Sequence, residues 1–377
     1  MSAVTEHALA VMREQVITAN RDRRPLRIRG GGTKDFYGQP LPAHGGEGGG
    51  VPAPEGTAEV LDCRANRGVL SYEPTELVIS ARCGTPLAEI EETLAAQRQY
   101  LPFEPPHFGG GATFGGAVAA GLSGPRRMAA GSLRDYVLGT TLLTAGGDVL
   151  RFGGQVMKNV AGYDVSRLLA GSLGVLGVIA EASLKVLPLP AAEQTLQLES
   201  TEADSIRRCN RWGGEPLPIS ATLWEGGRLW VRLSGAGAAV AAAAGRLGGE
   251  RVATDRADEL WRSVREQTHD FFADAGVVWR LSVPSATPPL ELAGQQLIEW
   301  GGALRWHVPV HDHDSAQALR DLVSRAGGSA TLFRVGSRAT VARFHPLEEA
   351  VRQIHMRLKQ EFDPNRIFNP GRMYDWL

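Results

Sequence analysis

Residues 108–181, FGGGATFGGAVAAGLSGPRRMAAGSLRDYVLGTTLLTAGGDVLRFGGQVMKNVAGYDVSRLLAGSLGVLGVIAE, form the stretch that decides the fold. This stretch is about twice as dense in glycine as the whole chain, which has 46 glycines among 377 residues. Glycine loses more backbone freedom on folding than other residues, so the runs 109–111 and 115–116 indicate positive φ angles or a closely approaching group. Because few charges and a small apolar run at 117–122 accompany them, that group should be largely apolar with a compact anionic part. A dinucleotide matches this description.

Four pieces of the stretch follow one another in an order that is typical of a flavoprotein family. They are 112–119 (ATFGGAVA), 131–139 (GSLRDYVLG), 162–164 (GYD) and 171–179 (GSLGVLGVI). The chain therefore resembles the FAD-binding domain of the vanillyl-alcohol-oxidase/PCMH superfamily. Within that superfamily it is most similar to the shorter FAD-binding subunits of glycolate oxidase complexes, which oxidise 2-hydroxy acids.

Composition describes an ordinary globular chain, 43% hydrophobic and 21% charged, that is long enough for two domains. The net charge of −1 does not favour nucleic acid as a partner, and we expect the basic patch at 21–29 to be a solvated start of a strand. The N-terminal segment is typical of an amphipathic helix rather than a signal peptide, and no stretch is long and apolar enough to span a membrane. We therefore expect a cytoplasmic protein, with association with a membrane through its partners as the alternative. Three scattered cysteines without a C-x-x-C pair indicate a reducing compartment and no iron–sulfur cluster or structural zinc.

The first predicted strand ends in a glycine turn at 29–34, RGGGTK. Successive backbone N–H groups of such a turn form an anion-binding nest, and a hydroxyl and an ammonium group add donors for a phosphate. Taken alone, the turn could also be a flexible hairpin, but the superfamily places its first pyrophosphate loop here. Some members attach FAD through a histidine of this loop. Because this chain has Thr33 and Lys34 there, we expect non-covalent FAD.

FAD needs neutralised pyrophosphate oxygens and a dry slot for its ring system. The glycine turns can supply backbone donors, Thr113 and Ser123 can supply hydroxyls, and 174–179 can supply a flat apolar edge. The predicted FAD-binding residues are Arg29, Gly30, Gly31, Gly32, Thr33, Lys34, Pro105, Gly110, Gly111, Thr113, Phe114, Gly115, Gly116, Ala119, Gly121, Ser123, Gly174, Gly177, Val178, Ile179 and Asn369. The sequence contains no G-x-G-x-x-G fingerprint, no phosphate loop of the G-x-x-x-x-G-K type and no H-E-x-x-H helix, and we expect no metal site.

Hydrophobic periodicity and turn residues predict an α+β fold, and the resemblance implies that its first part is a two-subdomain PCMH-type unit. Helices are expected at 5–20, 85–97, 114–122 and 163–170, and strands at 26–29, 59–61, 77–80, 136–144, 149–152 and 175–187. Residues 38–56 are rich in glycine and proline and are expected to form a mobile surface loop. Pro188 and Pro190 mark a domain boundary, because proline continues neither a central strand nor a helix.

The following part of the chain alternates short strands and helices, which predicts an α+β layer with helices on one face of a sheet. The resemblance implies that this part is a ferredoxin-like cap domain. Strands are expected at 194–198, 220–224, 229–233, 277–283, 303–308 and 330–334, and helices at 202–211, 236–246, 257–272 and 315–326. After a helix at 346–360, the ending 363–372, DPNRIFNPGR, resembles the glycolate oxidase branch, in which the tail returns to the flavin domain. The resemblance thus implies a discontinuous FAD-binding domain, 1–187 plus 345–377, and a cap at 188–344.

Oxidation of a 2-hydroxy acid by hydride transfer needs a cation for the carboxylate, a base for the hydroxyl proton, and the Cα–H held against the flavin. Arg280 lies on an apolar strand and is a candidate cation, with a structural ion pair as the alternative; His307 and His345 are the other catalytic candidates. His311 and His313 could share one strand face, which would suit a metal, but a charged strand end in water is the simpler interpretation. Catalytic members of the family tend to carry a histidine cluster with a nearby acid near the end of the cap. Only His345 stands there, which puts independent catalysis in doubt.

The resemblance implies an FAD-binding subunit of a glycolate (2-hydroxy acid) oxidase or dehydrogenase complex. Such a subunit would oxidise glycolate to glyoxylate by hydride transfer to the flavin. Its expected partners are a longer FAD-containing catalytic subunit and an iron–sulfur subunit, and the absence of a cysteine cluster fits that division of labour. Two alternatives stay open: a self-sufficient FAD-dependent 2-hydroxy acid dehydrogenase of the lactate type, and a non-catalytic flavin-binding scaffold subunit.

Overall fold

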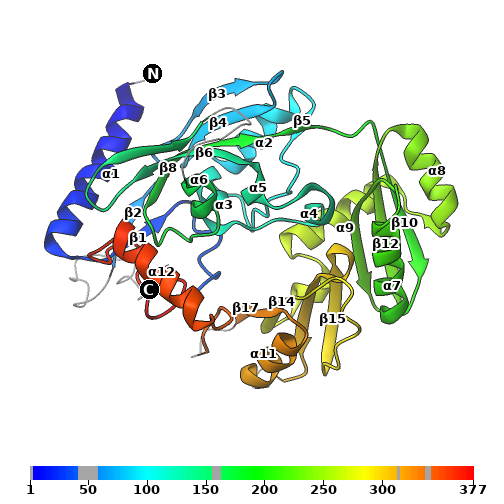
Figure 1. Ribbon diagram of the computed structural model, residues 1–377. Helices are drawn as coiled ribbons and strands as arrows, with labels where there is room; N and C mark the ends of the chain where they lie inside the picture. Colours follow the sequence, from blue (N-terminus) through cyan, green and yellow to red (C-terminus); the bar gives the residue numbers. More distant parts are fainter. Residues whose placement is uncertain (1–2, 41–57, 155–162, 312–314, 336–340) are drawn as a thin grey trace.

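The computed structural model describes residues 3–40, 58–154, 163–311, 315–335 and 341–377. Within these residues the chain forms two halves, each built on an antiparallel sheet, that lie side by side (Figure 1). The α+β fold class is confirmed. Among the described residues, no helix combines the length and the apolar character needed to cross a membrane.

The chain begins with a helix packed on a small parallel sheet. Helix α1 (Ala3–Asp22) buries Met12 and Val16 against strands β1 (Leu26–Arg29) and β2 (Glu59–Asp62), which pair in parallel. Apolar residues four positions apart lie on the same side of a helix, which is why the pattern predicted this helix. The predicted strands are confirmed too. Strand β1 delivers the chain directly into the glycine turn.

A five-stranded antiparallel sheet with the order β3-β4-β8-β6-β7 forms the body of the first half. Its strands are β3 (Val69–Glu73), β4 (Val78–Arg82), β6 (Val137–Leu143), β7 (Val149–Gly153) and β8 (Val178–Lys185). All seven residues of β6 are buried, so the sheet is covered on both sides at its centre. Strand β3 was not predicted, because it is a half-exposed edge strand without a buried apolar run.

Short helices surround this sheet and position the glycine-rich loops. They are α2 (Leu87–Ala95), α3 (Phe114–Ala120), α4 (Arg127–Ala130), α5 (Leu133–Tyr136) and α6 (Val165–Leu169). Thr113 is the N-cap of α3, since its Oγ1 accepts a hydrogen bond from the backbone N–H of Gly116. Gly121 is the C-cap and adopts the left-handed conformation (φ 63°). A side-chain cap and a C-terminal glycine thus set both ends.

The predicted strand 175–187 is too long at both ends. The regular strand is β8, and Gly177, with φ 154°, precedes it in a conformation that favours glycine. After β8 the chain leaves this sheet, and β9 (Leu187–Pro188) pairs instead with β5 (Gln99–Tyr100). The change of partner occurs where the prolines begin.

An eight-stranded antiparallel sheet with the order β13-β10-β12-β11-β15-β16-β14-β17 forms the second half. Its strands are β10 (Ala192–Glu199), β11 (Ile219–Glu225), β12 (Arg228–Gly235), β13 (Glu250–Arg251), β14 (Val277–Ser282), β15 (Gly294–Glu299), β16 (Leu304–Pro309) and β17 (Ser329–Val335). Strands β13 and β15 were not predicted. Strand β15 lies between β11 and β16, but it begins with the polar run Gly-Gln-Gln, which is not typical of a central strand.

Helices lie on both faces of this sheet, not on one face as predicted. Helices α7 (Glu202–Gly213), α8 (Gly237–Leu247) and α11 (Ala316–Arg325) cover one face, and α9 (Thr254–Glu266) and α10 (Asp270–Ala273) contribute to the core on the other, next to the first half. The predicted helix 257–272 is in fact α9 and α10, because Gln267 adopts the left-handed conformation between them (φ 55°).

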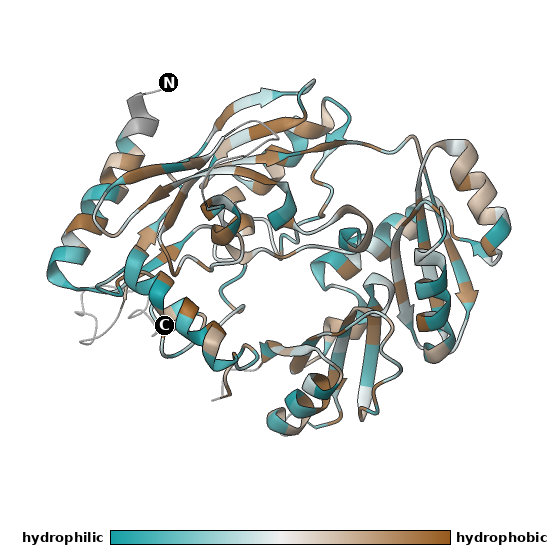
Figure 2. Ribbon diagram, in the orientation of Figure 1, coloured by the Kyte–Doolittle hydropathy of each residue, from teal (hydrophilic) through white to brown (hydrophobic). Residues whose placement is uncertain are grey.

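The end of the chain returns to the first half. Helix α12 (Glu349–Phe362) is drawn in red below the first sheet (Figure 1), and its hydrophilic outer side is visible in Figure 2. The ammonium of Lys359, 1% exposed, donates to Val175 O (2.7 Å), Phe368 O (2.9 Å) and Asp363 Oδ2 (2.8 Å). An isolated bridge between Leu26 and Phe368 joins the tail to β1. The tail therefore lies directly beside the glycine turn.

Candidate functional site

Four chain segments converge on one solvent-open cavity of about 600 Å³. It is lined by Arg27, Ile28, Arg29, Gly30, Gly31, Gly32, Thr33, Lys34, Asp35, Thr113, Gly116, Ala119, Ala120, Leu173, Asn369 and Arg372. A second cavity of about 430 Å³ shares several of these residues and extends to Cys63, Cys83, Gly115, Gly174, Gly177 and Ile179. We call the two cavities together the cradle.

The two glycine turns of the cradle touch each other through their backbones. A Cβ atom built on Gly31 would lie 1.5 Å from Gly111 O, and one on Gly30 would lie 2.3 Å from Thr113 Oγ1. Neither position leaves room for a side chain. The tandem glycines of the sequence are therefore explained by close approach of two loops that are far apart along the chain.

The first turn presents backbone donors to the cavity. Among the described residues, no acceptor takes a hydrogen bond from the backbone N–H groups of 30–34; the first N–H of the turn that is used is that of Asp35, which donates to Gly32 O (3.0 Å). Residues 30–34 all line the larger cavity. Consecutive N–H groups without an acceptor in such a turn are suited to bind an anion, and the predicted phosphate site lies at this turn.

The charges around this nest are mostly positive. Arg27, Arg29, Lys34 and Arg372 line the larger cavity, and Asp35 is the only acid among the described residues that do so. The carboxylate of Asp35 binds two of the cations, Arg27 Nη2 at 2.6 Å and Arg29 Nε at 3.0 Å. The excess of positive charge suits a pyrophosphate, whose oxygens accept charge-assisted hydrogen bonds.

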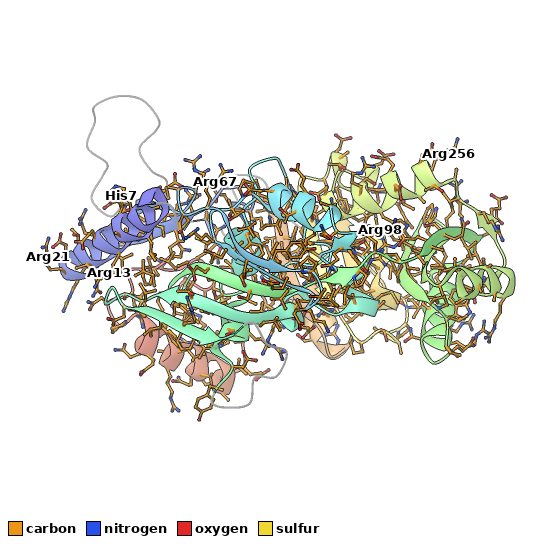
Figure 3. The ribbon with its side chains drawn as sticks, turned by 90° about the horizontal axis from the view of Figure 1, so that it is seen from above. His7, Arg13, Arg21, Arg67, Arg98 and Arg256 are labelled. Carbon is orange, nitrogen blue, oxygen red and sulfur yellow. The ribbon has the colours of Figure 1, made fainter. Side chains whose placement is uncertain are left out.

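The basic patch at 21–29 is therefore not simply solvated. Arg21 is at the surface, with 72% of its side chain exposed (Figure 3), whereas Arg27 and Arg29 line the cradle. Sequence position alone could not separate them. The strand carries only the last two arginines to the cavity, which is the physical reason for the correction.

Two of the cations, Arg372 and Lys34, are largely buried and donate hydrogen bonds to backbone carbonyl oxygens. Arg372 donates to Gln39 O (2.7 Å), Lys34 O (3.1 Å) and Asp35 O (2.9 Å), and so fixes the turn from the tail side. Burial lowers the pKa of Arg372 to about 10, so it stays charged at neutral pH. Burial also lowers the pKa of Lys34 to about 8, and its Nζ donates to His107 O (3.3 Å).

Most of the predicted FAD-binding residues line the cradle. These are Arg29, Gly30, Gly31, Gly32, Thr33, Lys34, Thr113, Gly115, Gly116, Ala119, Gly174, Gly177, Ile179 and Asn369. Asn369 ties the tail to two segments, since its Oδ1 accepts from Ile28 N (2.8 Å) and its Nδ2 donates to Leu173 O (2.7 Å). The sequence analysis missed Arg27, Asp35, Leu173 and Arg372. Arg372 had a signal, because it closes the family-like ending.

The remaining predicted residues are not among those that line the cradle. They are Pro105, Gly110, Gly111, Phe114, Gly121, Ser123 and Val178. Phe114 and Val178 are buried in hydrophobic cores. Ser123 Oγ accepts a hydrogen bond from Leu133 N (3.0 Å) and so positions α5. Phe114, Val178 and Ser123 are therefore part of the framework around the cradle, whereas Gly110 and Gly111 are exposed.

Beside the cradle, the two halves meet in an aromatic cluster. In the first half, the rings of Phe36 and Phe108 pack edge-on with their centres 5.3 Å apart. The ring centre of Phe36 lies 5.5 Å from that of Phe333 in the second half, and the ring centre of Phe333 lies 5.0 Å from that of Trp306. The Lys34 ammonium lies 5.6 Å from the centre of the Phe108 ring, so the cluster continues from the cradle. The two halves thus share one hydrophobic core.

The sheet face that is turned to the first half carries a half-buried cation, Arg280, and a buried acid, Glu299. The Arg280 guanidinium lies 5.2 Å from the Trp300 ring, and burial lowers its pKa. Glu299, 3% exposed, accepts a hydrogen bond from Trp306 Nε1 (2.7 Å) with one oxygen, and its Oε1 has no partner within the described ranges. Burial raises the pKa of Glu299 to about 7. Such an acid can accept a proton near neutral pH.

The sequence analysis missed Glu299. Its only signal is a single acid between Ile298 and Trp300, within an otherwise apolar stretch. The two histidine candidates take other places: His307 pairs with Trp279, which faces α11, and its Nδ1 lies 3.2 Å from Gln295 O.

His345 connects α11 and β17 rather than lining the cradle. Its Nδ1 accepts from Ala330 N (3.2 Å) and its Nε2 lies 3.2 Å from Ser324 Oγ. Burial lowers its pKa. His313, Gly162 and residues 41–57 of the expected surface loop lie outside the described residues.

Comparison with known proteins agrees with this geometry. Residues 10–153 match the family described as FAD binding domain. The fold is similar to that of a solved alkyldihydroxyacetonephosphate synthase, with a TM-score of 0.65 at 15% identity over 95% of this chain and 74% of the other. The chain therefore contains an FAD-binding domain of the PCMH type.

The chain is 46% identical over 361 residues to the glycolate oxidase subunit GlcE of Escherichia coli, which covers 96% of each protein. It belongs to this family of FAD-dependent oxidoreductase subunits. More distant relatives match only in part: glycolate oxidase subunit GlcD of Bacillus subtilis is 31% identical over 46% of this chain and 34% of its own length. A D-lactate dehydrogenase of Archaeoglobus fulgidus is 36% identical over 45% of this chain and 35% of its own length.

Proposed function

We propose that this chain binds FAD non-covalently in the cradle and works as the FAD-binding subunit of a complex that oxidises glycolate. The observation that carries the proposal is the nest at 30–34, whose N–H groups have no acceptor in the part of the chain that the structure describes, with an excess of arginine and lysine around it. The 46% identical relative is named as a glycolate oxidase subunit, which supports glycolate as the 2-hydroxy acid.

The residues present suit FAD. The backbone of 30–34, together with Arg29 and Arg372, would hold the pyrophosphate, and the backbone from Gly174 to Ile179 would border a flat ring. When bound, FAD supplies a two-electron acceptor for hydride. Thr33 and Lys34 stand where some relatives carry a histidine, which supports non-covalent binding.

We propose the division into an FAD-binding domain, 1–187 plus 345–377, and a cap, 188–344. The first strand of the large sheet, β10, begins just after the prolines at 188 and 190. The buried ammonium of Lys359 and the amide of Asn369 bind the tail to the first half. These contacts support assigning the end of the chain to the FAD-binding domain.

In the cap, Arg280 would hold the substrate carboxylate and Glu299 would take the hydroxyl proton. The two residues lie on strands β14 and β15, which are separated by β16 in the same sheet, and the Oε1 of Glu299, which has no partner among the described residues, is available to a hydroxyl group. Removal of that proton favours departure of hydride from the same carbon atom.

The expected partners are a longer FAD-containing subunit and an iron–sulfur subunit. The partial match to GlcD supports a common origin with the longer subunit. All three cysteines of this chain are buried free thiols. Electrons would therefore leave through another chain.

The test is the visible spectrum of the purified chain, alone and with its longer partner subunit, before and after anaerobic glycolate. We expect flavin bands that acid precipitation releases into the supernatant, and bleaching by glycolate in the complex. A chain that holds no flavin and binds no added FAD contradicts the cofactor assignment. Flavin that stays with the precipitate contradicts non-covalent binding.

A non-catalytic flavin-binding scaffold is a second candidate, because the aromatic cluster packs the Arg280 face against the first half. The variant Arg280→Gln separates the two. If the cap binds substrate, the variant complex shows a raised KM for glycolate, whereas Arg228→Gln, at an exposed position of the same sheet, does not. Unchanged kinetics of Arg280→Gln with flavin still bound favours the scaffold.

A further inference from the structure

The floor of the cradle contains two cysteines that the proposed function does not use. Cys63 directly follows β2 and Cys83 directly follows β4. Their exposed fractions are 5% and 3%, and both line the deeper cavity of the cradle. Both are free thiols.

The two cysteines are neighbours in the fold. A Cβ atom built on Gly84, which follows Cys83, would lie 2.1 Å from Cys63 O, and both cysteines belong to one core cluster and line one cavity. The Cys63 thiol donates to Leu61 O (3.8 Å), and the Cys83 sulfur accepts a hydrogen bond from Asn66 Nδ2 (3.5 Å). The nearby Cys63 thiol is the main cause that lowers the pKa of Cys83, while the pKa of Cys63 is raised by Cys83 and by burial. Cys83 is thus the better nucleophile of the pair, and Cys63 is placed to resolve a mixed disulfide.

Each cysteine is bonded through its backbone to one of the cradle loops. Cys63 N donates to Arg29 O (2.9 Å), at the start of the first glycine turn. Gly115 N donates to Cys83 O (2.8 Å), and a Cβ atom on Gly115 would lie 2.4 Å from Cys83 Cβ. A movement of either cysteine therefore moves a loop of the cradle.

We propose that Cys63 and Cys83 form a redox modification site: a dithiol that closes to a disulfide when the cradle is open, and whose disulfide form binds FAD more weakly. A disulfide needs an S–S distance of about 2.05 Å with a restricted dihedral angle, so the two sulfur atoms must move to covalent bonding distance. That movement changes the position of the first glycine turn relative to the Gly115 segment. The effect on FAD rests on the proposed function, whereas disulfide formation does not.

The oxidant is a small-molecule disulfide, RSSR. The Cys83 thiolate attacks one sulfur of RSSR, which forms a Cys83–S–S–R bond and releases RS⁻. The Cys63 thiol then loses its proton and attacks the Cys83 sulfur, which forms the Cys63–Cys83 disulfide and releases a second RS⁻. Overall, two cysteine thiols are oxidised, and one RSSR is reduced to two RSH.

Cys209 provides an internal control. It is buried in the second half, between α7 and the large sheet, and burial raises its pKa to about 12. It is not among the residues that line the cradle. An oxidant that merely reaches all thiols of a partly unfolded chain would modify Cys209 as well.

The test treats the full chain with oxidised glutathione, once freed of flavin and once with FAD at saturation. Peptide mapping then identifies the thiols that are lost. We expect a Cys63–Cys83 cross-link in the flavin-free chain, protection by FAD, and an intact Cys209 thiol. A flavin-free chain without the cross-link, or with Cys209 oxidised equally fast, overturns the proposal.

The second measurement compares the FAD affinity of the reduced and the cross-linked chain, by quenching of FAD fluorescence. We expect about tenfold weaker binding after cross-linking. The variant Cys63→Ala should keep its affinity through the same treatment. Equal affinity of the two forms overturns the coupling to FAD. A reduced chain that binds no FAD instead contradicts the proposed function, while the cross-link is still judged by mapping.

Discussion

The cradle and the inner face of the large sheet are built in opposite ways. In the cradle, backbone N–H groups and touching glycine turns make the surface, as at Gly31 and Gly111. On the sheet face, single side chains stand on regular strands beside tryptophans: Arg280 lies over the Trp300 ring, and Glu299 accepts a hydrogen bond from Trp306. Backbone recognition needs particular residues in a row, and it leaves a pattern in the sequence. Recognition by one side chain on a strand leaves none.

The two regions also treat charge differently. In the cradle, four cations gather around an open cavity with one acid. On the sheet face, Glu299 is withdrawn from water, and burial raises its pKa to about 7. The cradle is therefore suited to a permanent anion, and the sheet face to a group that gains and loses a proton.

The largest effect is expected where the tail is tied to the cradle half. Lys359→Met leaves the Asp363 carboxylate buried without its cation, which should lower the free energy of unfolding by about 3–5 kcal/mol. Urea denaturation measures the change. Arg357→Met, at an exposed position of the same helix, is the control and should change stability by less than about 0.5 kcal/mol. Equal effects of both variants would contradict a buried attachment of the tail.

The next effect concerns the sheet face and depends on pH. Glu299 keeps its proton up to about pH 7 in the folded chain, whereas its ordinary pKa is 4.5. The folded state therefore binds more protons in this window, and stability falls as the pH rises from about 4.5 to 7. Glu299→Gln should remove this slope and gain about 3 kcal/mol over the parent chain above pH 7.

Thermal or urea unfolding of both proteins at a series of pH values measures this difference. Glu259→Gln, whose side chain is 65% exposed, should follow the parent curve. Parallel curves for the parent and Glu299→Gln would show that this carboxyl is ionised in the folded chain.

A third prediction tests backbone recognition in the cradle. Gly31→Ala places a methyl group against Gly111 O, and the strain of about 1–3 kcal/mol should weaken FAD binding about 5- to 150-fold. Gly110→Ala is the matched control, because a Cβ atom there meets nothing within 4 Å. Flavin titration compares them. Comparable losses in both variants would mean that contact between the turns does not shape the site.

The smallest effect is expected from Arg372→Lys. Lysine keeps the positive charge but cannot reach all three carbonyl oxygens that the guanidinium binds, so the turn is held less firmly. We expect about tenfold weaker FAD binding in the same titration. If only the charge of Arg372 mattered, the affinity would stay unchanged.

The cradle could be predicted in large part, and the sheet face could not. The turn 29–34 and Asn369 were predicted because glycine runs and the family-like ending mark them in the sequence. Strand β15 was missed because it starts with Gly-Gln-Gln, and with it Glu299 at its end. Arg27 and Arg29 could not be told from Arg21, because only the direction of β1 brings them to the cavity.

The sequence by itself determined the fold class, the two glycine turns and the return of the tail, because glycine, proline and hydrophobic spacing act locally on the backbone. Only the tertiary structure decided which side chains meet. Cys63 and Cys83 are 20 positions apart, yet folding makes them neighbours, and Leu26 and Phe368, at opposite ends of the chain, form a bridge. Such contacts depend on strand order and register, which local preferences do not specify.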